Sequence, residues 1–141
     1  MLFYAETKCE CGVIGSDAND LLKPYNRKIG PDPATLATAL VGGILNNNSS
    51  GMCCGTAQNS YKTIRSIRVV LLDGSILDTS DQKSIDQFLK EKPQMVEDLL
   101  QLRKDILADE ELTHLIHHKY KIKNTTGYGL NSLVDFENII D

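Results

Sequence analysis

The chain has 141 residues, of which 41% are hydrophobic and 6% aromatic, and its formal net charge at pH 7 is −4. This length allows one domain with a core but not two ordinary domains, and the hydrophobic content is that of a folded globular protein, so disorder is not the default expectation. A negative net charge provides no basic surface for a phosphate backbone, so we expect no nucleic-acid partner.

The sequence also limits where the protein resides. No apolar run reaches the roughly eighteen residues of a membrane-spanning helix, so we expect no membrane span. The N-terminal stretch lacks the basic region followed by apolar residues that marks a secretory signal. We therefore expect a cytoplasmic protein, with peripheral membrane association left open for a longer parent protein. The four cysteines are expected to be small, buried, reduced thiols: Cys9, Cys11, Cys53 and Cys54.

The first third of the chain predicts short elements separated by loops. Residues 13–15 have the character of a strand, and Ser16 can cap a short helix that Pro24 helps to end. Residues 30–55 are rich in Gly, Asn, Ser, Thr and Pro but contain apolar pairs, which is typical of a loop that enters the interior. We expect residues 42–51 to have little regular secondary structure.

The middle of the chain predicts a β-hairpin. Residues 66–72 (SIRVVLL) have the composition of a buried strand, and residues 75–78 are expected to return antiparallel to it. Asp73-Gly74 between them is a strong signal for a two-residue hairpin turn.

Helices are predicted after the hairpin. Thr79 and Gln82 have the spacing of a capping box, Pro93 suits the first turn of a longer helix, and Asp109 can cap a last one. Residues 120–136 are expected to return to loop and strand. The order predicts an α+β fold with an antiparallel sheet flanked by helices, in a single domain over residues 1–141.

The Gly- and Asn-rich loop is the most informative segment. Glycines let a backbone approach a ligand closely, and successive N–H groups can form a concave site for a phosphate. Asn and Ser side chains add neutral hydrogen-bond donors. From the residues alone, an anion-binding loop and a tightly packed loop fit equally well.

Three blocks in order resemble FAD-linked oxidases of the vanillyl-alcohol oxidase / p-cresol methylhydroxylase (PCMH) superfamily, nearest to the D-lactate and D-2-hydroxyglutarate dehydrogenases. They are residues 30–61 (GPDPATLATALVGGILNNNSSGMCCGTAQNSY), 69–79 (VVLLDGSILDT) and 120–136 (YKIKNTTGYGLNSLVDF). The resemblance implies the second lobe of a PCMH-type FAD-binding domain. Ile44 departs from the Asn that many members carry after the paired glycines.

The resemblance also implies which residues hold FAD, and it assigns no catalytic residue and no metal ligand to this chain. The implied cofactor-binding residues are Pro31, Asp32, Gly42, Gly43, Asn47, Asn48, Ser50, Gly51 and Gly55. The family's upstream phosphate loop and its substrate-binding cap have no counterpart in the sequence, so we expect a partial domain. Such a domain is expected to be inactive alone, to purify without FAD and to form a homo-oligomer, such as a dimer.

The implied function of the parent protein is oxidation of a D-2-hydroxy acid, with electrons passed to an acceptor and an iron–sulfur cluster possible elsewhere. One alternative is a non-catalytic α+β module that self-associates or binds a partner. Another is a flavoprotein oxidase of an alcohol or sugar. An open groove around Gly42, Gly43 and Gly51 favours flavin binding, whereas coverage of these glycines by the chain itself favours packing.

Two further clusters suggest metal sites, but simpler interpretations are favoured. His114, His117 and His118 are expected to be a solvated helix end, and the cysteine pairs lack the usual spacing of zinc ligands. Lys119, Lys121 and Lys123 alternate as on an exposed edge strand.

Overall fold

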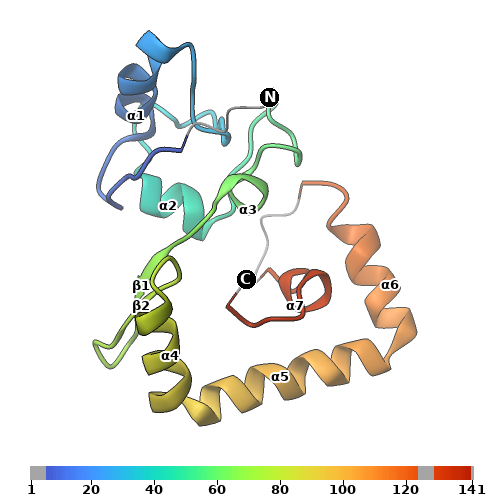
Figure 1. Ribbon diagram of the computed structural model, residues 1–141. Coiled ribbons are helices and arrows are strands. Elements are labelled where there is room, and N and C mark those ends of the chain that lie inside the picture. The colour runs from blue at the N-terminus through green and yellow to red at the C-terminus, as the bar shows by residue number, and fades with distance from the viewer. Residues whose placement is uncertain (1–5, 124–128, 141) are drawn as a thin grey trace, which may run out of the picture. The chain divides into compact units, whose positions relative to one another are not determined.

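The computed structural model describes residues 6–123 and 129–140 (Figure 1). The chain divides into two compact units, Met1–Ile64 and Arg65–Asp141. The prediction of a single domain over residues 1–141 concerns how these units fit together, and it stays a prediction.

The first unit contains short helices joined by long hydrogen-bonded loops (Figure 1). Its core is small: among the residues of this unit that the structure describes, the buried apolar side chains are Ala18, Val41, Ile44 and Cys54. The helices are α1 (Gly15–Leu22), a 3₁₀ helix η1 (Lys23–Tyr25), α2 (Val41–Asn46) and α3 (Ser60–Thr63).

The start of this unit differs from the sequence prediction. The expected strand at residues 13–15 is reduced to one bridge between Ile14 and Leu40, because Gly15 already belongs to α1. Ser16 is not the cap, since the N-cap position is Ile14 and no side chain caps the helix. The N–H of Gly15 instead donates to the carbonyl of Ala39. Contacts with a distant segment therefore replace a local cap.

The prediction of little regular structure over residues 42–51 is wrong for its first half. Helix α2 occupies Val41–Asn46 despite its two glycines, and it ends before Ser50. Its first two N–H groups, on Val41 and Gly42, donate to the carbonyls of Val13 and Cys11. Tertiary hydrogen bonds thus offset the low helix propensity of glycine.

The second unit consists of a hairpin followed by helices (Figure 1). Its strands and helices are β1 (Arg68–Val70), β2 (Ile76–Asp78), α4 (Gln82–Glu91), α5 (Pro93–Ala108), α6 (Glu110–Lys119) and α7 (Ser132–Asp135). Helix α4 contacts β2 and α5, and α5 contacts both α6 and α7. Arg103 on α5 donates from Nε to the carbonyl of Phe136, which fastens the segment after α7 to α5.

The hairpin confirms the predicted antiparallel pairing, with Arg68 opposite Asp78 and Val70 opposite Ile76. The turn is longer than the two residues predicted. The N–H of Leu71 donates to the carbonyl of Ser75, and Gly74, at φ +83°, donates to the carbonyl of Leu71. This is a three-residue hairpin loop with glycine in the left-handed conformation.

The expectation of a buried first strand is wrong. Val70 is 67% exposed and Leu72 is fully exposed, whereas Val69 and Leu71 on the alternate face are half-buried. A strand with one exposed face retains the period-two alternation of side chains. The apolar run therefore predicted a strand, but β1 is shorter than the expected residues 66–72 and is not buried on both faces.

The helices of the second unit begin almost where predicted, although one cap is different. Asp81 caps α4 by accepting from the N–H of Lys83, so the capping box predicted from Thr79 and Gln82 is wrong. Thr79 instead accepts from the N–H of Ile67 beside the hairpin. Asp109 caps α6 as predicted, accepting from the N–H of Leu112.

The tail of the chain is helical where a strand was predicted. Residues 129–136 form a turn and α7, and Lys119 is the last residue of α6. Lys121 and Lys123 lie in turn or coil, so the predicted edge strand is wrong for these lysines. Residues 124–128 of the third sequence block lie outside the described residues.

The α+β class is confirmed, since helices accompany a two-stranded antiparallel sheet. In the parts of the chain that the structure describes, no helix is both long enough and apolar enough to cross a membrane.

Candidate functional site

The candidate site lies in the first unit, where residues 30–33 and 41–51 come together. The two segments meet at Gly51: a methyl group added there would lie 1.6 Å from the carbonyl oxygen of Asp32. No side chain fits in that space, so glycine is required by a close approach of the chain to itself.

Helix α3 supports the same two segments. On one side, a methyl group added at Gly30 would lie 2.6 Å from the Cγ2 of Thr63 in α3. On the other side, the Oγ of Ser60 donates to the carbonyl of Ile44 at 3.1 Å. Asn59 caps α3 by accepting from the N–H of Lys62. The short α3 therefore contacts both halves of the candidate site.

The turn after α2 is a Schellman motif. Asn48 follows the C-cap Asn47 with φ +42°, its N–H donates to the carbonyl of Leu45, and the N–H of Ser49 donates to the carbonyl of Ile44. Glycine is the usual residue at this left-handed position, and Asn is the common substitute. The Oδ1 of Asn48 also accepts from the N–H of Tyr61 at 2.9 Å.

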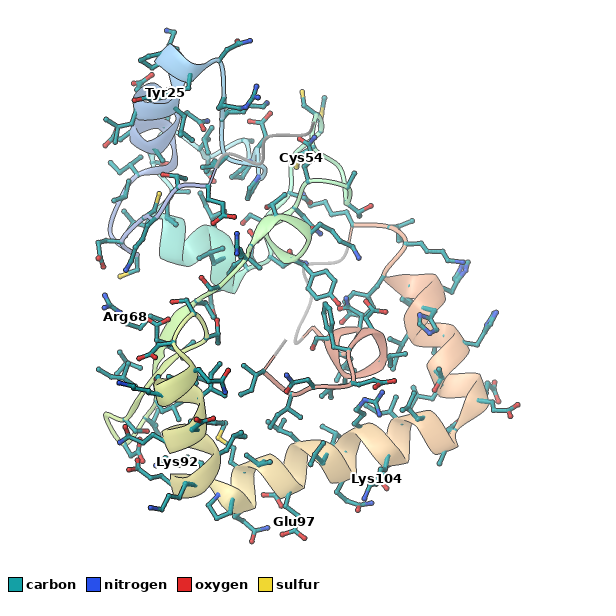
Figure 2. All side chains as sticks on the ribbon, viewed as in Figure 1. Tyr25, Cys54, Arg68, Lys92, Glu97 and Lys104 are labelled. Carbon is teal, nitrogen blue, oxygen red and sulfur yellow. The ribbon has the colours of Figure 1, made fainter. Side chains whose placement is uncertain are left out.

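A second turn follows at residues 51–55. The Sγ of the buried Cys54 accepts from the N–H of Gly51 at 2.9 Å, and the N–H of Gly55 donates to the carbonyl of Gly51. Gly55 has φ +51°, and a methyl group added there would meet no atom of the described residues within 4 Å. Figure 2 labels Cys54 within this loop.

The nine predicted cofactor-binding residues fall into three groups by accessibility. Gly43, Asn47 and Gly55 are exposed, and a methyl group at Gly43 would likewise meet no described atom within 4 Å. Pro31 and Ser50 are buried. The remaining four are half-buried: Asp32, Gly42, Asn48 and Gly51. Only the first group offers backbone that a ligand could approach without rearrangement.

Coverage of Gly42, Gly43 and Gly51 by the chain itself was expected to favour packing, and open space around them to favour flavin binding. The structure shows both. Gly42 is covered by the chain itself, since an added methyl group would lie 2.9 Å from the Cβ of Cys11. Gly51 is covered by the Asp32 backbone, whereas Gly43 is open. The packing interpretation therefore applies to Gly42 and Gly51, and the ligand interpretation is left with Gly43.

An open hollow of about 490 Å³ lies on this unit. Asp32, Pro33 and Leu36 line it together with Met52 and Cys53. Of the nine predicted residues, Asp32 alone lines the hollow, and its carboxylate lies 3.5 Å from the Nζ of Lys28. The hollow is thus a separate feature from the exposed Gly43 surface.

The cysteines and histidines were the candidate metal ligands. The four cysteines are free thiols, but only Cys54 is buried; Cys11 and Cys53 are exposed, so the expectation of buried thiols is wrong for these two. His114, His117 and His118 lie exposed on α6, as expected of a solvated helix end. His117 lies 3.8 Å from the carboxylate of Asp135. Within the described residues, no three metal-binding side chains gather.

Sequence reasoning did not single out Asn59 and Ser60. An Asn immediately before a short polar helix is an N-cap signal, and it could have located the start of α3. The bond from Ser60 to Ile44 spans sixteen residues and has no local signature.

Comparison with known proteins shows the family of the chain. The sequence pattern of the FAD binding domain family matches residues 4–80, which is more than half of the chain and includes all nine predicted residues. No solved structure matches the chain significantly.

Curated relatives match about half of the chain. D-2-hydroxyglutarate dehydrogenase of Haemophilus influenzae is 32% identical over 79 residues, covering 56% of this chain and 8% of that protein. D-2-hydroxyglutarate dehydrogenase of Escherichia coli is 35% identical over 72 residues, covering 51% of this chain and 7% of that protein. The matched region thus spans less than a tenth of each relative. The chain belongs to the FAD binding domain family, as a PCMH-type domain close to the D-2-hydroxyglutarate dehydrogenases, and FAD is the cofactor of that family.

Proposed function

We propose that this chain is the FAD-binding portion of a flavin-dependent oxidoreductase that oxidises a D-2-hydroxy acid, such as D-2-hydroxyglutarate or D-lactate. The observation that carries the proposal is the family match over residues 4–80, which includes the whole Gly- and Asn-rich segment. The substrate class is supported by the names of the relatives, which are D-2-hydroxyglutarate dehydrogenases.

Three of the predicted residues leave room for direct contact with a cofactor. Gly43 and Gly55 have open space where a side chain would be. Asn47, which lies between them in the sequence, is exposed. We expect these three to contact FAD directly. Gly42, Ser50 and Gly51 pack within the chain, so their role is to shape the loop. When bound, FAD supplies the hydride acceptor, and this chain's residues hold and orient it.

A substitution at Gly43 tests the cofactor contact. Gly43→Ala is expected to raise the free energy of unfolding by about 0.5–1 kcal/mol, because Gly43 lies inside α2 and an added methyl group meets no described atom. The same methyl group is expected to weaken FAD binding at least tenfold, because it occupies the space left for the cofactor. Opposite effects on stability and affinity would distinguish a contact from a folding defect.

The measurement is titration of the purified chain with FAD, followed by flavin fluorescence. We expect colourless protein that binds added FAD weakly, since half of the pyrophosphate contacts are expected from another segment and each 1.4 kcal/mol lost is about tenfold in affinity. Asn46→Ala is the matched control, because Asn46 is exposed on α2 and lies outside the predicted site. Equal FAD affinity of Gly43→Ala and wild type would contradict the contact.

The substrate is tested on the longest natural polypeptide that contains this chain, loaded with FAD under anaerobic conditions. Addition of D-2-hydroxyglutarate or D-lactate is expected to bleach the flavin absorption, and L-lactate serves as the control. Bleaching by an alcohol or a sugar instead would support the alternative oxidase.

The packing of Gly42 and Gly51 favours a second candidate function, a non-catalytic module that associates through exposed apolar surface. In the second unit, apolar side chains on α5 and α6 are more than one third exposed: Met95, Leu100, Leu102, Leu107, Leu112 and Leu115. Light scattering of wild type and Leu100→Lys would test self-association. A concentration-dependent dimer that the lysine variant abolishes, together with no FAD binding by the longest polypeptide, would favour this candidate.

A further inference from the structure

Asn48 is assigned to FAD by resemblance, but its surroundings indicate another role. Its backbone occupies the left-handed position of the Schellman motif that ends α2. Its side-chain Oδ1 accepts from the N–H of Tyr61, thirteen residues away. Because a backbone N–H can only donate, this bond fixes which end of the amide faces α3.

Ser60 makes the companion bond from the same side. It is 3% exposed, and its Oγ donates to the carbonyl of Ile44. That carbonyl also accepts from the N–H of Ser49, which closes the Schellman motif. Two side-chain bonds therefore join α3 to the last turn of α2, one through Asn48 and one through Ser60.

We propose that Asn48 and Ser60 are positioning residues, which fasten the end of α2 to α3 and so hold Gly43 and Asn47 where the cofactor can approach them. Asn48 acts through its backbone conformation and its Oδ1, rather than as a direct contact to FAD. This inference rests on the proposed function of the site. It departs from the role that the resemblance assigns to Asn48.

Three properties of Asn48 can be separated by substitution. Asn48→Asp retains the Oδ1 acceptor but replaces the amide donor with a negative charge. Asn48→Gly retains the left-handed conformation but loses the acceptor. Asn48→Ala loses the acceptor and is strained at positive φ. Asn46→Ala, on the exposed side of α2, is the control.

The first measurement needs no cofactor. Hydrogen exchange of the Tyr61 N–H and the amide chemical shifts of Gly43 and Asn47 are recorded by NMR on each variant. We expect Asn48→Asp to retain wild-type protection of Tyr61 and wild-type shifts. Asn48→Gly and Ser60→Ala should lose at least tenfold in protection and shift Gly43 and Asn47, with the largest changes in Asn48→Ala. Unchanged protection and shifts in Asn48→Gly and Ser60→Ala would overturn the proposal.

The second measurement is FAD affinity. If Asn48 positions the loop, Asn48→Asp should bind FAD within about threefold of wild type, whereas Asn48→Ala should bind at least tenfold more weakly. A carboxylate in direct contact with a pyrophosphate would instead be repelled. Loss of FAD binding by Asn48→Asp with intact Tyr61 protection would therefore show a direct contact and overturn the proposal.

The two measurements also separate this inference from the proposed function. If wild type fails to bind FAD in the longest natural polypeptide, the proposed function fails, and with it the reason for positioning Gly43 and Asn47. The exchange and shift data still decide whether Asn48 and Ser60 hold the end of α2.

Discussion

The two units of the chain are stabilised in different ways. In the first unit, side chains reach distant backbone groups: Asn19 accepts from the N–H of Ile29, and Asn48 accepts from the N–H of Tyr61. In the second unit, Asp81 and Asp109 cap α4 and α6 locally, and the helices leave much apolar surface exposed. Arg103 on α5 also reaches a distant carbonyl, that of Phe136, so both units contain long-range bonds, but in the first unit these bonds join loops and short helices. The contact between Asn48 and Tyr61 lies at the candidate site.

The largest expected effect that separates the two units comes from Gly51→Ala. The added methyl group would overlap the Asp32 carbonyl, which is backbone and cannot rotate away, so we expect a loss of about 3 kcal/mol or more from the first unit. Hydrogen exchange resolved by residue should show lost protection in residues 6–64 and little change in residues 65–123. Equal destabilisation of both units would mean that they fold as one, as the single-domain prediction requires.

The core of the second unit is tested by Ile106→Ala. Ile106 is 5% exposed on α5, and truncation of a buried isoleucine typically costs about 2–4 kcal/mol. Its neighbour Leu107 is 37% exposed, so Leu107→Ala should cost less than about 1 kcal/mol. Urea unfolding followed by circular dichroism at 222 nm, mainly a signal of helices, compares the two. Similar costs for both variants would mean that another partner covers Leu107.

The surroundings of Gly51 and Ile106 explain why the sequence predicted the second unit better than the first. The apolar spacing around Ile106 and the cap at Asp109 are local signals, and both helices appear close to where the sequence placed them. The contact between Gly51 and Asp32 joins residues nineteen positions apart and has no local signal. The sequence did single out Gly51. The residues alone could not show whether the space beside it holds a ligand or another segment of the chain.

For the candidate site, the sequence indicated the segment but not the structure within it. The Gly- and Asn-rich composition located the segment, and the family match includes it. Composition could not show that α2 would form over Gly42 and Gly43, because hydrogen bonds to Val13 and Cys11 stabilise its first turn. Nor could it show that Asn48 would turn toward Tyr61. Each of these depends on segments that become neighbours only after folding.

A smaller effect is expected from removal of a helix cap. Asp109→Ala should destabilise the second unit by about 1 kcal/mol, because the N–H of Leu112 loses its acceptor. Asp105→Ala, on the exposed side of α5, is the control, because it removes the same charge and only an exposed bond from the Gln101 side chain. Thermal unfolding of the three proteins at one pH provides the comparison. An Asp109→Ala variant as stable as the Asp105→Ala variant would contradict the cap.

The smallest effect concerns pH. Hydrogen bonds from Lys92 and then from Ser75 hold the pKa of Asp73 well below its ordinary value of 3.8. Because the pKa is lower in the folded chain, the stabilisation is complete above the unfolded value and is lost as pH falls through the folded one. Figure 2 shows Lys92 where α4 meets α5.

Thermal unfolding of wild type and Asp73→Asn between pH 7 and pH 2 would measure this contribution. We expect wild type to be slightly more stable at pH 7, and the difference to shrink below pH 3.8. High salt should reduce the difference at pH 7, because the pair is exposed to solvent. A stability difference that grows as pH falls would contradict the lowered pKa of Asp73.

The close approach of Gly51 to Asp32 has a consequence for the order of folding. Helices and hairpins form in about 0.1–10 μs, because their contacts are close in sequence. The Gly51–Asp32 contact requires closure of the intervening loop, and its entropic cost must be met before any contact is made. The hairpin and α4–α6 are therefore expected to form while the Gly- and Asn-rich segment is still open. A full-length chain that refolds would therefore pass through a state in which its helices have formed but residues 41–51 have not yet closed on residues 30–33.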